Sequence, residues 1–188
     1  PPPHTCPTRR SSDLENDIQL NVQDPLVSIW LGNRSRIAAH FDQPDNIACC
    51  AAGRRRFILF PPDEIVNLYP GPIDFTPAGQ IISMVDFEKP DFDAFPRFRA
   101  ALEQAQVAEL EPGDAVWVPS MWWHHVEGLE VLNVLINYWW NATPGWMDAP
   151  ASVLDYALLA LRDLPKRQRE AWKAIFDFYV FDFEEASI

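Results

Sequence analysis

The stretch of sequence that decides the fold is Pro112-Gly113-Asp114-Ala115-Val116-Trp117-Val118-Pro119-Ser120-Met121-Trp122-Trp123-His124-His125. A Pro-Gly-Asp turn opens it, and turns of this composition favour a tight hairpin connection between strands. Two segments with the composition of strands follow, Ala115 to Val118 and Trp122 to Glu127, and Pro119 separates them. Because proline cannot continue a central strand, the stretch predicts two short strands rather than one long one.

Segments of the same kind lie on both sides of this stretch, and turn residues such as Gly53 and Pro61-Pro62 separate them. Many short strands divided by turns are typical of an antiparallel barrel or sandwich. A Pro- and Gly-containing loop is expected from 63 to about 93, followed by a short helix over 95–105. The other expected strands are 28–32, 35–41, 46–51, 56–60, 107–110 and 132–139.

The pattern changes to helical spacing near the C-terminus. One apolar face is predicted from Val153 to Leu164, and Pro165 is well suited to start a second helix. A wide apolar stripe follows on that second helix, which is more apolar than a free surface. The stripe consists of Trp172, Ile175, Phe176, Tyr179, Val180 and Phe183. The sequence therefore predicts an all-β core with a C-terminal helical appendage.

Composition limits the possible partners. The chain has 188 residues, a formal net charge of −12 and a pI near 4.6. This charge argues against a nucleic-acid backbone or an anionic membrane as partner. No apolar run is long enough to span a membrane, and the three cysteines indicate no disulfide framework, so the cytoplasm is the expected location. Residues 1–15 have no periodicity, and we expect them to be a disordered or artefactual tail.

The few histidines point to a metal site. Outside the tail they are His40, His124 and His125, and all three lie on expected strands. In His40-Phe41-Asp42, positions i and i+2 share one face of a strand, so a ring nitrogen and a carboxylate oxygen point the same way. A second histidine from another strand completes two histidines and one carboxylate, a ligand set that leaves metal positions open.

Residue spacing alone leaves alternatives open. Taken alone, His40 and Asp42 could instead be a histidine at a strand end and a carboxylate in the following turn. His124 and His125 alternate faces of one strand, so only one of the two can point inward.

A wider set of motifs resembles a known family. These motifs are His40-Phe41-Asp42 with Asn46, 57–62 (FILFPP), 91–96 (DFDAFP), 112–125, and 137–139 (NYW). Together they resemble cupin-like, JmjC-type Fe(II)/2-oxoglutarate oxygenases, in a bacterial branch similar to the asparaginyl hydroxylase of hypoxia-inducible factor. The resemblance implies a double-stranded β-helix, the cupin or jelly-roll barrel, over residues 16–145, with its N-terminal part missing.

The resemblance also implies roles for individual residues. Fe(II) would be held by His40, Asp42 and His124, because the family ligand directly follows the paired tryptophans. 2-Oxoglutarate would be the co-substrate, with Arg55 in the place of the lysine that holds its distal carboxylate. The side chains implied to line its site are Asn46, Asn137 and Trp139.

Two departures from the family pattern concern the co-substrate. Arg55 replaces a lysine, and Ile37 stands where the similar hydroxylase has a threonine that contacts the co-substrate. Arg55 could instead belong to a surface triplet with Arg54 and Arg56.

The expected function is hydroxylation of an unidentified substrate, either a protein side chain or a small molecule. The alternatives are a cupin metalloprotein that uses another metal without 2-oxoglutarate, and a non-catalytic barrel that binds a ligand or protein. Residues 146–188 are expected to form a homodimer through their helices, as the similar hydroxylase does.

Overall fold

A computed structural model describes residues 25–73, 79–141 and 143–182. The predicted tail, residues 1–15, lies outside the described residues. The chain divides into two compact units, residues 1–142 and 143–188, and each is described by itself. This division falls close to the boundary after residue 145 that the sequence suggests.

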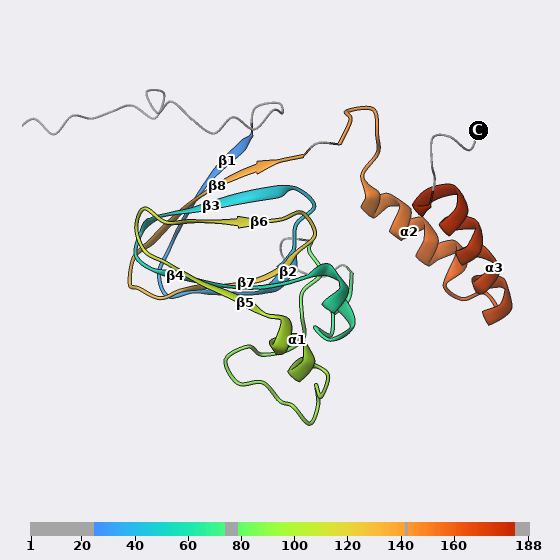
Figure 1. Ribbon diagram of the computed structural model, residues 1–188, viewed down its shortest axis with the longest axis horizontal. Helices are drawn as coiled ribbons and strands as arrows, with labels where there is room; N and C mark the ends of the chain where they lie inside the picture. The colour runs from blue at the N-terminus through green and yellow to red at the C-terminus, as the bar shows by residue number, and fades with distance from the viewer. Residues whose placement is uncertain (1–24, 74–78, 142, 183–188) are drawn as a thin grey trace, which may run out of the picture. The chain divides into compact units, whose positions relative to one another are not determined.

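The first unit is built from two antiparallel four-stranded sheets that face each other (Figure 1). Their strand orders are β1-β8-β3-β6 and β2-β7-β4-β5, so strands distant in the chain are neighbours in space. The strands are β1 Leu26–Gly32, β2 Arg36–Phe41, β3 Asp45–Ala52, β4 Arg55–Phe60, β5 Gln106–Leu110, β6 Ala115–Val118, β7 Trp123–Gly128 and β8 Asn133–Trp140. The expected double-stranded β-helix is thereby confirmed.

Alternation along the strands builds the core between the two sheets. On β3 the side chains of Ala48 and Cys50 are buried, and on β4 those of Phe57 and Leu59. Each pair is spaced by two residues, so both members of a pair point to the same side of their sheet. The buried core cluster draws on both sheets and consists of Ala48, Cys50, Phe57, Leu59, Leu110, Val118, Val126 and Leu135.

A second apolar cluster lies on the outer side of the β2-β7-β4-β5 sheet. There the helix α1, Phe98–Gln104, and the long loop before it cover the strands (Figure 1). Trp123 of β7 is 1 % exposed in this cluster, and Phe98 of α1 likewise. The cluster consists of Ala39, Phe60, Leu68, Val85, Phe98, Ala101 and Trp123. The part of the β2-β7-β4-β5 sheet around Ala39, Phe60 and Trp123 is therefore buried on both faces.

The expected long loop is partly regular. It opens with a 3-10 helix, η2 Pro62–Val66, and later pairs with the edge of β2. The Ser83 amide donates to the Ala39 carbonyl oxygen at 2.7 Å, and Ile82 bridges to His40. The loop thereby extends the sheet beside a strand that carries a candidate ligand.

The Pro-Gly-Asp turn does not make a hairpin, so that expectation was wrong. β5 and β6, which the turn connects, lie in different sheets. The turn instead bonds to β3, because the Gly113 amide donates to the Cys50 carbonyl oxygen and the Cys50 amide donates to that of Asp114, both at 2.8 Å. It carries the chain from one sheet to the other.

A substitution at Gly53, in the turn between β3 and β4, tests how tightly this part of the barrel is packed. The φ of Gly53 is +75°, and an added Cβ would lie against the Leu132 carbonyl oxygen and 2.5 Å from Asn133 Oδ1. Gly53→Ala is expected to lower the free energy of unfolding by about 3 kcal/mol, from backbone strain and overpacking together. For a chain of this size that corresponds to a melting temperature lower by roughly 6–12 °C.

Gly79→Ala is the matched control for this change. Gly79 has the same φ of +75°, but nothing lies within 4 Å of its added Cβ. Gly79→Ala is therefore expected to lower the free energy of unfolding by the backbone strain alone, about 1 kcal/mol. Thermal unfolding followed by circular dichroism compares the two variants, and equal losses would show that the contact around Gly53 is not tight.

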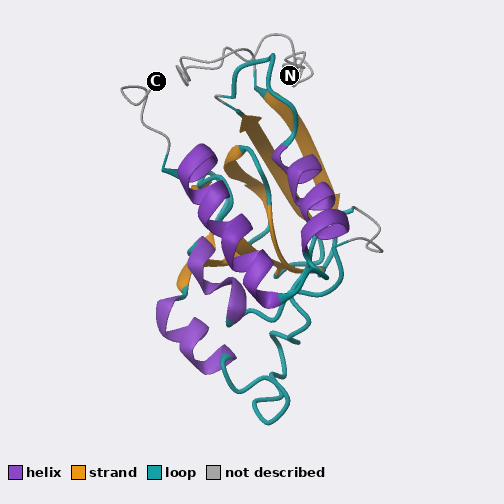
Figure 2. Cartoon of the chain, turned by 90° about the vertical axis from the view of Figure 1, so that its right-hand side faces the viewer, coloured by secondary structure: helices purple, strands orange, loops and turns teal. Residues whose placement is uncertain are grey.

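The second unit is helical, and all the strands named above belong to the first unit (Figure 2). Its helices are α2 Pro150–Leu161 and α3 Lys166–Phe176, and α3 continues into a π-helical turn, η3 Asp177–Phe181. Pro165 stands at the N-cap of α3. The predicted helical appendage is confirmed. Among the described residues, no helix is long and apolar enough to cross a membrane.

Candidate metal centre

His40 and His124 lie directly opposite each other on the neighbouring strands β2 and β7. Their ring centroids are 4.3 Å apart. The register shifts between Ile37 and His40, where β2 takes one residue more than β7. Without this bulge, alternation from Ile37 would turn His40 to the outer side of the sheet. β-Bulges near functional sites re-aim side chains in this way.

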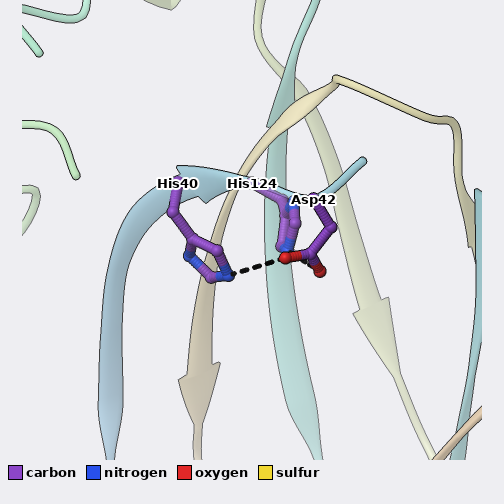
Figure 3. A group of neighbouring side chains, drawn as sticks. All are labelled: His40, Asp42 and His124. Atoms are coloured by element: carbon purple, nitrogen blue, oxygen red, sulfur yellow. Dashed lines mark ion pairs between the residues drawn. The ribbon is translucent and has the colours of Figure 1, made fainter. Parts of the chain in front are cut away.

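Asp42 follows the end of β2 and completes the group. The His40 Nε2 atom is 4.0 Å from Asp42 Oδ1, and the His124 Nε2 atom is 3.7 Å from Asp42 Oδ2. Figure 3 shows both imidazole rings turned towards this carboxylate. The Met121 amide donates to the Asp42 carbonyl oxygen at 2.8 Å, which ties the turn before β7 to the end of β2.

Backbone carbonyls orient both rings in the same manner. The Nδ1 atom of His40 lies 2.9 Å from the Ala38 oxygen, and that of His124 lies 3.1 Å from the Trp122 oxygen. A carbonyl oxygen only accepts, so Nδ1 carries the proton and Nε2 keeps its lone pair. This is the usual arrangement of a metal-binding histidine. Both Nε2 atoms therefore have a lone pair available to bind a metal.

The electrostatic surroundings keep His124 neutral. Burial, and secondly the nearby charge of His40, lower the pKa of His124 to about 4. At neutral pH its ring is therefore unprotonated, which is the form that binds a metal.

His125 points to the other side of the sheet. Its ring stacks on Phe87 at 4.5 Å between centroids, and its Nε2 atom lies 3.3 Å from Glu127 Oε1. Of the two neighbouring histidines, the structure brings only His124 to His40 and Asp42.

The donor set fits a divalent metal ion. The offered ligand atoms of His40, Asp42 and His124 all lie within 4.8 Å of one another. In the described part of the chain, this is the one such group of three. Two imidazole nitrogens and one carboxylate on one side of an ion form the facial arrangement of non-haem Fe(II) sites.

Arg55 occupies the inward face of β4, on the same side as Phe57 and Leu59. It is 3 % exposed, and its Nε atom is buried without a hydrogen-bond partner. Burial lowers the pKa of Arg55. Arg54 pairs instead with Glu130 on an exposed surface, and Arg56 pairs with exposed Glu109 and partly buried Glu127. Arg55 is thus set apart from its neighbours as a buried cation with spare hydrogen-bonding capacity.

The two predicted asparagines contact each other between β3 and β8. The Asn137 Nδ2 atom donates to Asn46 Oδ1 at 2.8 Å, while Asn137 Oδ1 is buried without a partner. The Nε1 atom of Trp139 is also buried and without a partner. Buried polar atoms without a partner are rare in protein interiors, and a bound ligand or water molecule can supply the missing partner.

Ile37 pairs with Val126 on β7 and is 38 % exposed.

A family profile described as a cupin-like domain matches residues 5–145. The chain belongs to this cupin-like family. The match confirms the family resemblance, and it starts within residues 1–15, the predicted tail.

Several curated relatives are similar to this cupin-like chain. Lysine-specific demethylase JMJ31 of Arabidopsis thaliana is 34% identical over 117 residues, covering 62% of this chain and 21% of the relative. HSPB1-associated protein 1 of Homo sapiens is 34% identical over 114 residues, covering 60% and 23%. tRNA wybutosine-synthesizing protein 5 of Gallus gallus is 30% identical over 146 residues, covering 70% and 43%. The cupin-like chain spans less than half the length of each of these relatives.

One contact at the site of this cupin-like protein was not predicted. The Gln80 Nε2 atom donates to Asp42 Oδ1 at 2.5 Å. Gln80 is 38 positions away in sequence, within the long loop, and no spacing rule connects the two residues. Only the pairing of that loop with β2 brings them together.

Proposed function

We propose that this cupin-like protein is an Fe(II)- and 2-oxoglutarate-dependent dioxygenase that hydroxylates a protein side chain or a small molecule. The observation that carries the proposal is the convergence of His40 Nε2, His124 Nε2 and the Asp42 carboxylate, with both rings oriented by carbonyls. Membership of the cupin-like family, with a demethylase among the relatives, supports an oxygenase.

The three side chains would hold Fe(II) on one side and leave its other side accessible. When bound, iron with 2-oxoglutarate supplies the oxidising power that hydroxylation needs. The chain's own contribution is placement, since the carbonyls of Ala38 and Trp122 fix the two rings before a metal arrives. A site that is already ordered loses little entropy on binding.

Arg55 is the proposed partner of the distal carboxylate of 2-oxoglutarate. It is buried on the inner side of β4 and has an unpartnered Nε atom. A guanidinium group binds a carboxylate through two parallel hydrogen bonds. Asn46, Asn137 and Trp139 would complete the lining, and Asn137 Oδ1 and Trp139 Nε1 are polar atoms still without partners.

Formation of succinate tests this function. The protein, Fe(II) and 2-oxoglutarate are incubated in air, and succinate is measured without added substrate, because such oxygenases turn over their co-substrate slowly on their own. We expect succinate from the wild type and none when Zn²⁺, which has no redox chemistry, replaces iron. Metal binding without any response to 2-oxoglutarate would favour a cupin metalloprotein of another kind.

We also propose that the second unit forms a homodimer. On α3 and η3 the apolar stripe residues Trp172, Ile175 and Tyr179 are 42 %, 43 % and 69 % exposed. Exposed apolar clusters of this kind mark interaction surfaces.

The free thiols of Cys49 and Cys50 support a cytoplasmic location.

Trp172→Asp is expected to shift the protein from dimer to monomer, because a carboxylate buried in an apolar interface lacks a partner. Sedimentation equilibrium measures the change. Ala174→Asp adds the same charge at an exposed position on the opposite side of α3 from Trp172, and it should leave the dimer intact. A monomeric wild type at micromolar concentration would contradict the proposal.

A further inference from the structure

The two oxygens of the Asp42 carboxylate have different surroundings. Oδ1 accepts a hydrogen bond from Gln80 Nε2 at 2.5 Å and lies 4.0 Å from His40 Nε2, whereas Oδ2 lies nearer to a ring nitrogen, 3.7 Å from His124 Nε2. The Asp42 side chain is 15 % exposed, so solvent reaches little of it. One oxygen is therefore already engaged by the protein before any metal binds.

Gln80 is held in place by the backbone that follows it. Ile82 bridges to His40, and the Ser83 amide donates to the Ala39 carbonyl oxygen at 2.7 Å. The Ser83 hydroxyl donates to the Leu68 carbonyl oxygen at 2.6 Å, and Ser83 is 4 % exposed. The segment that carries Gln80 is thus fixed to the same strand as His40. Its amide reaches Asp42 from an anchored position.

We propose that Gln80 is a positioning residue that makes Asp42 a ligand through Oδ2 alone. A carboxylate can bind a divalent ion through one oxygen or through both. Binding through both would occupy a further coordination position. A hydrogen bond to Oδ1 favours binding through one oxygen, and thereby keeps open the positions that a co-substrate and dioxygen require. The inference rests on the metal site of the proposed function and adds how its open positions are preserved.

The test uses Mn²⁺ alone with the full chain and the variant Gln80→Met, which keeps the length of the side chain but has no donor. Water-proton relaxation at saturating protein reports how many water molecules the bound Mn²⁺ carries. If Asp42 turns to bind through both oxygens, one of three waters is lost, and the relaxation enhancement falls by about one third for a six-coordinate ion. Removing a residue that hydrogen-bonds to a metal ligand, as Gln80 does to Asp42, weakens metal affinity by about 10–100-fold, so the site can still be saturated with Mn²⁺.

Gln43→Met is the matched control, because Gln43 directly follows Asp42 but its side chain is exposed. It should leave both the affinity and the water count of the wild type unchanged. Gln80→Leu should repeat the result of Gln80→Met, and unchanged circular dichroism shows that the variants are folded.

The outcomes separate the inference from the proposed function. An unchanged water count in folded, Mn²⁺-loaded Gln80→Met overturns the role of Gln80 and leaves the proposed function standing. A wild type that binds no Mn²⁺ overturns the metal site itself, and with it the proposed function.

Discussion

Replacing His124 with alanine is expected to abolish metal binding, whereas the same change at His125 leaves the metal bound. The His124 ring presents Nε2 towards Asp42, and the Trp122 carbonyl holds its other nitrogen. Two remaining ligands cannot make a facial site. The loss of metal affinity should exceed the roughly 10–100-fold weakening that results when a hydrogen-bond partner of a metal ligand is removed. Calorimetric titration of the apo-protein with Co²⁺ measures the affinity.

His125→Ala is the matched control because the two histidines are neighbours on β7. Its ring is buried and stacks on Phe87 outside the barrel, so truncation should cost about 3 kcal/mol of stability but little metal affinity. His40→Ala and Asp42→Ala should behave like His124→Ala. Loss of metal with His125→Ala but not with His124→Ala would overturn the choice of ligand.

Replacing Arg55 with methionine is expected to weaken 2-oxoglutarate binding by about 10–100-fold, the factor that corresponds to charge-assisted hydrogen bonds of 1.5–3 kcal/mol. Metal affinity should not change, because Arg55 is not among the ligands. The free protein should be at least as stable as before, since Arg55 is buried, its Nε atom is unpartnered, and burial disfavours its charge. Calorimetric titration of the metal-loaded protein with 2-oxoglutarate gives the affinity.

Arg54→Met controls for the loss of one positive charge in the same triplet. Arg54 pairs with Glu130 on the surface, so 2-oxoglutarate affinity should remain that of the wild type. Arg55→Lys keeps the charge and should lose less than Arg55→Met. Full co-substrate affinity in Arg55→Met would show that another group holds the distal carboxylate.

Local patterns in the sequence predict the strands and the helices well. Short β-rich segments bounded by Gly53, Pro61-Pro62 and Pro119 correspond to strands within one or two residues, because these breakers act locally. The His-x-Asp pair brings two candidate ligands together for the same reason. The choice of His124 over His125 came from the family resemblance, since alternation alone allows either.

Non-local features could not be predicted. The bulge between Ile37 and His40 depends on the register with β7, and composition does not encode that register. The turn at Gly113 bonds to β3 rather than closing a hairpin, because the chain crosses to the other sheet there. The Gln80 contact requires the loop to pair with β2. Each of these depends on elements distant in sequence.

Anaerobic titration with Fe(II) and then 2-oxoglutarate tests the central claim most directly. A chelate of the 2-oxo acid on iron held by His40, Asp42 and His124 gives a metal-to-ligand charge-transfer band in the visible spectrum. We predict that this band appears on addition of 2-oxoglutarate to the Fe(II)-loaded wild type, and that it does not appear with His124→Ala. Absence of the band in the wild type, with iron shown to be bound, would contradict the assignment as a 2-oxoglutarate-dependent oxygenase.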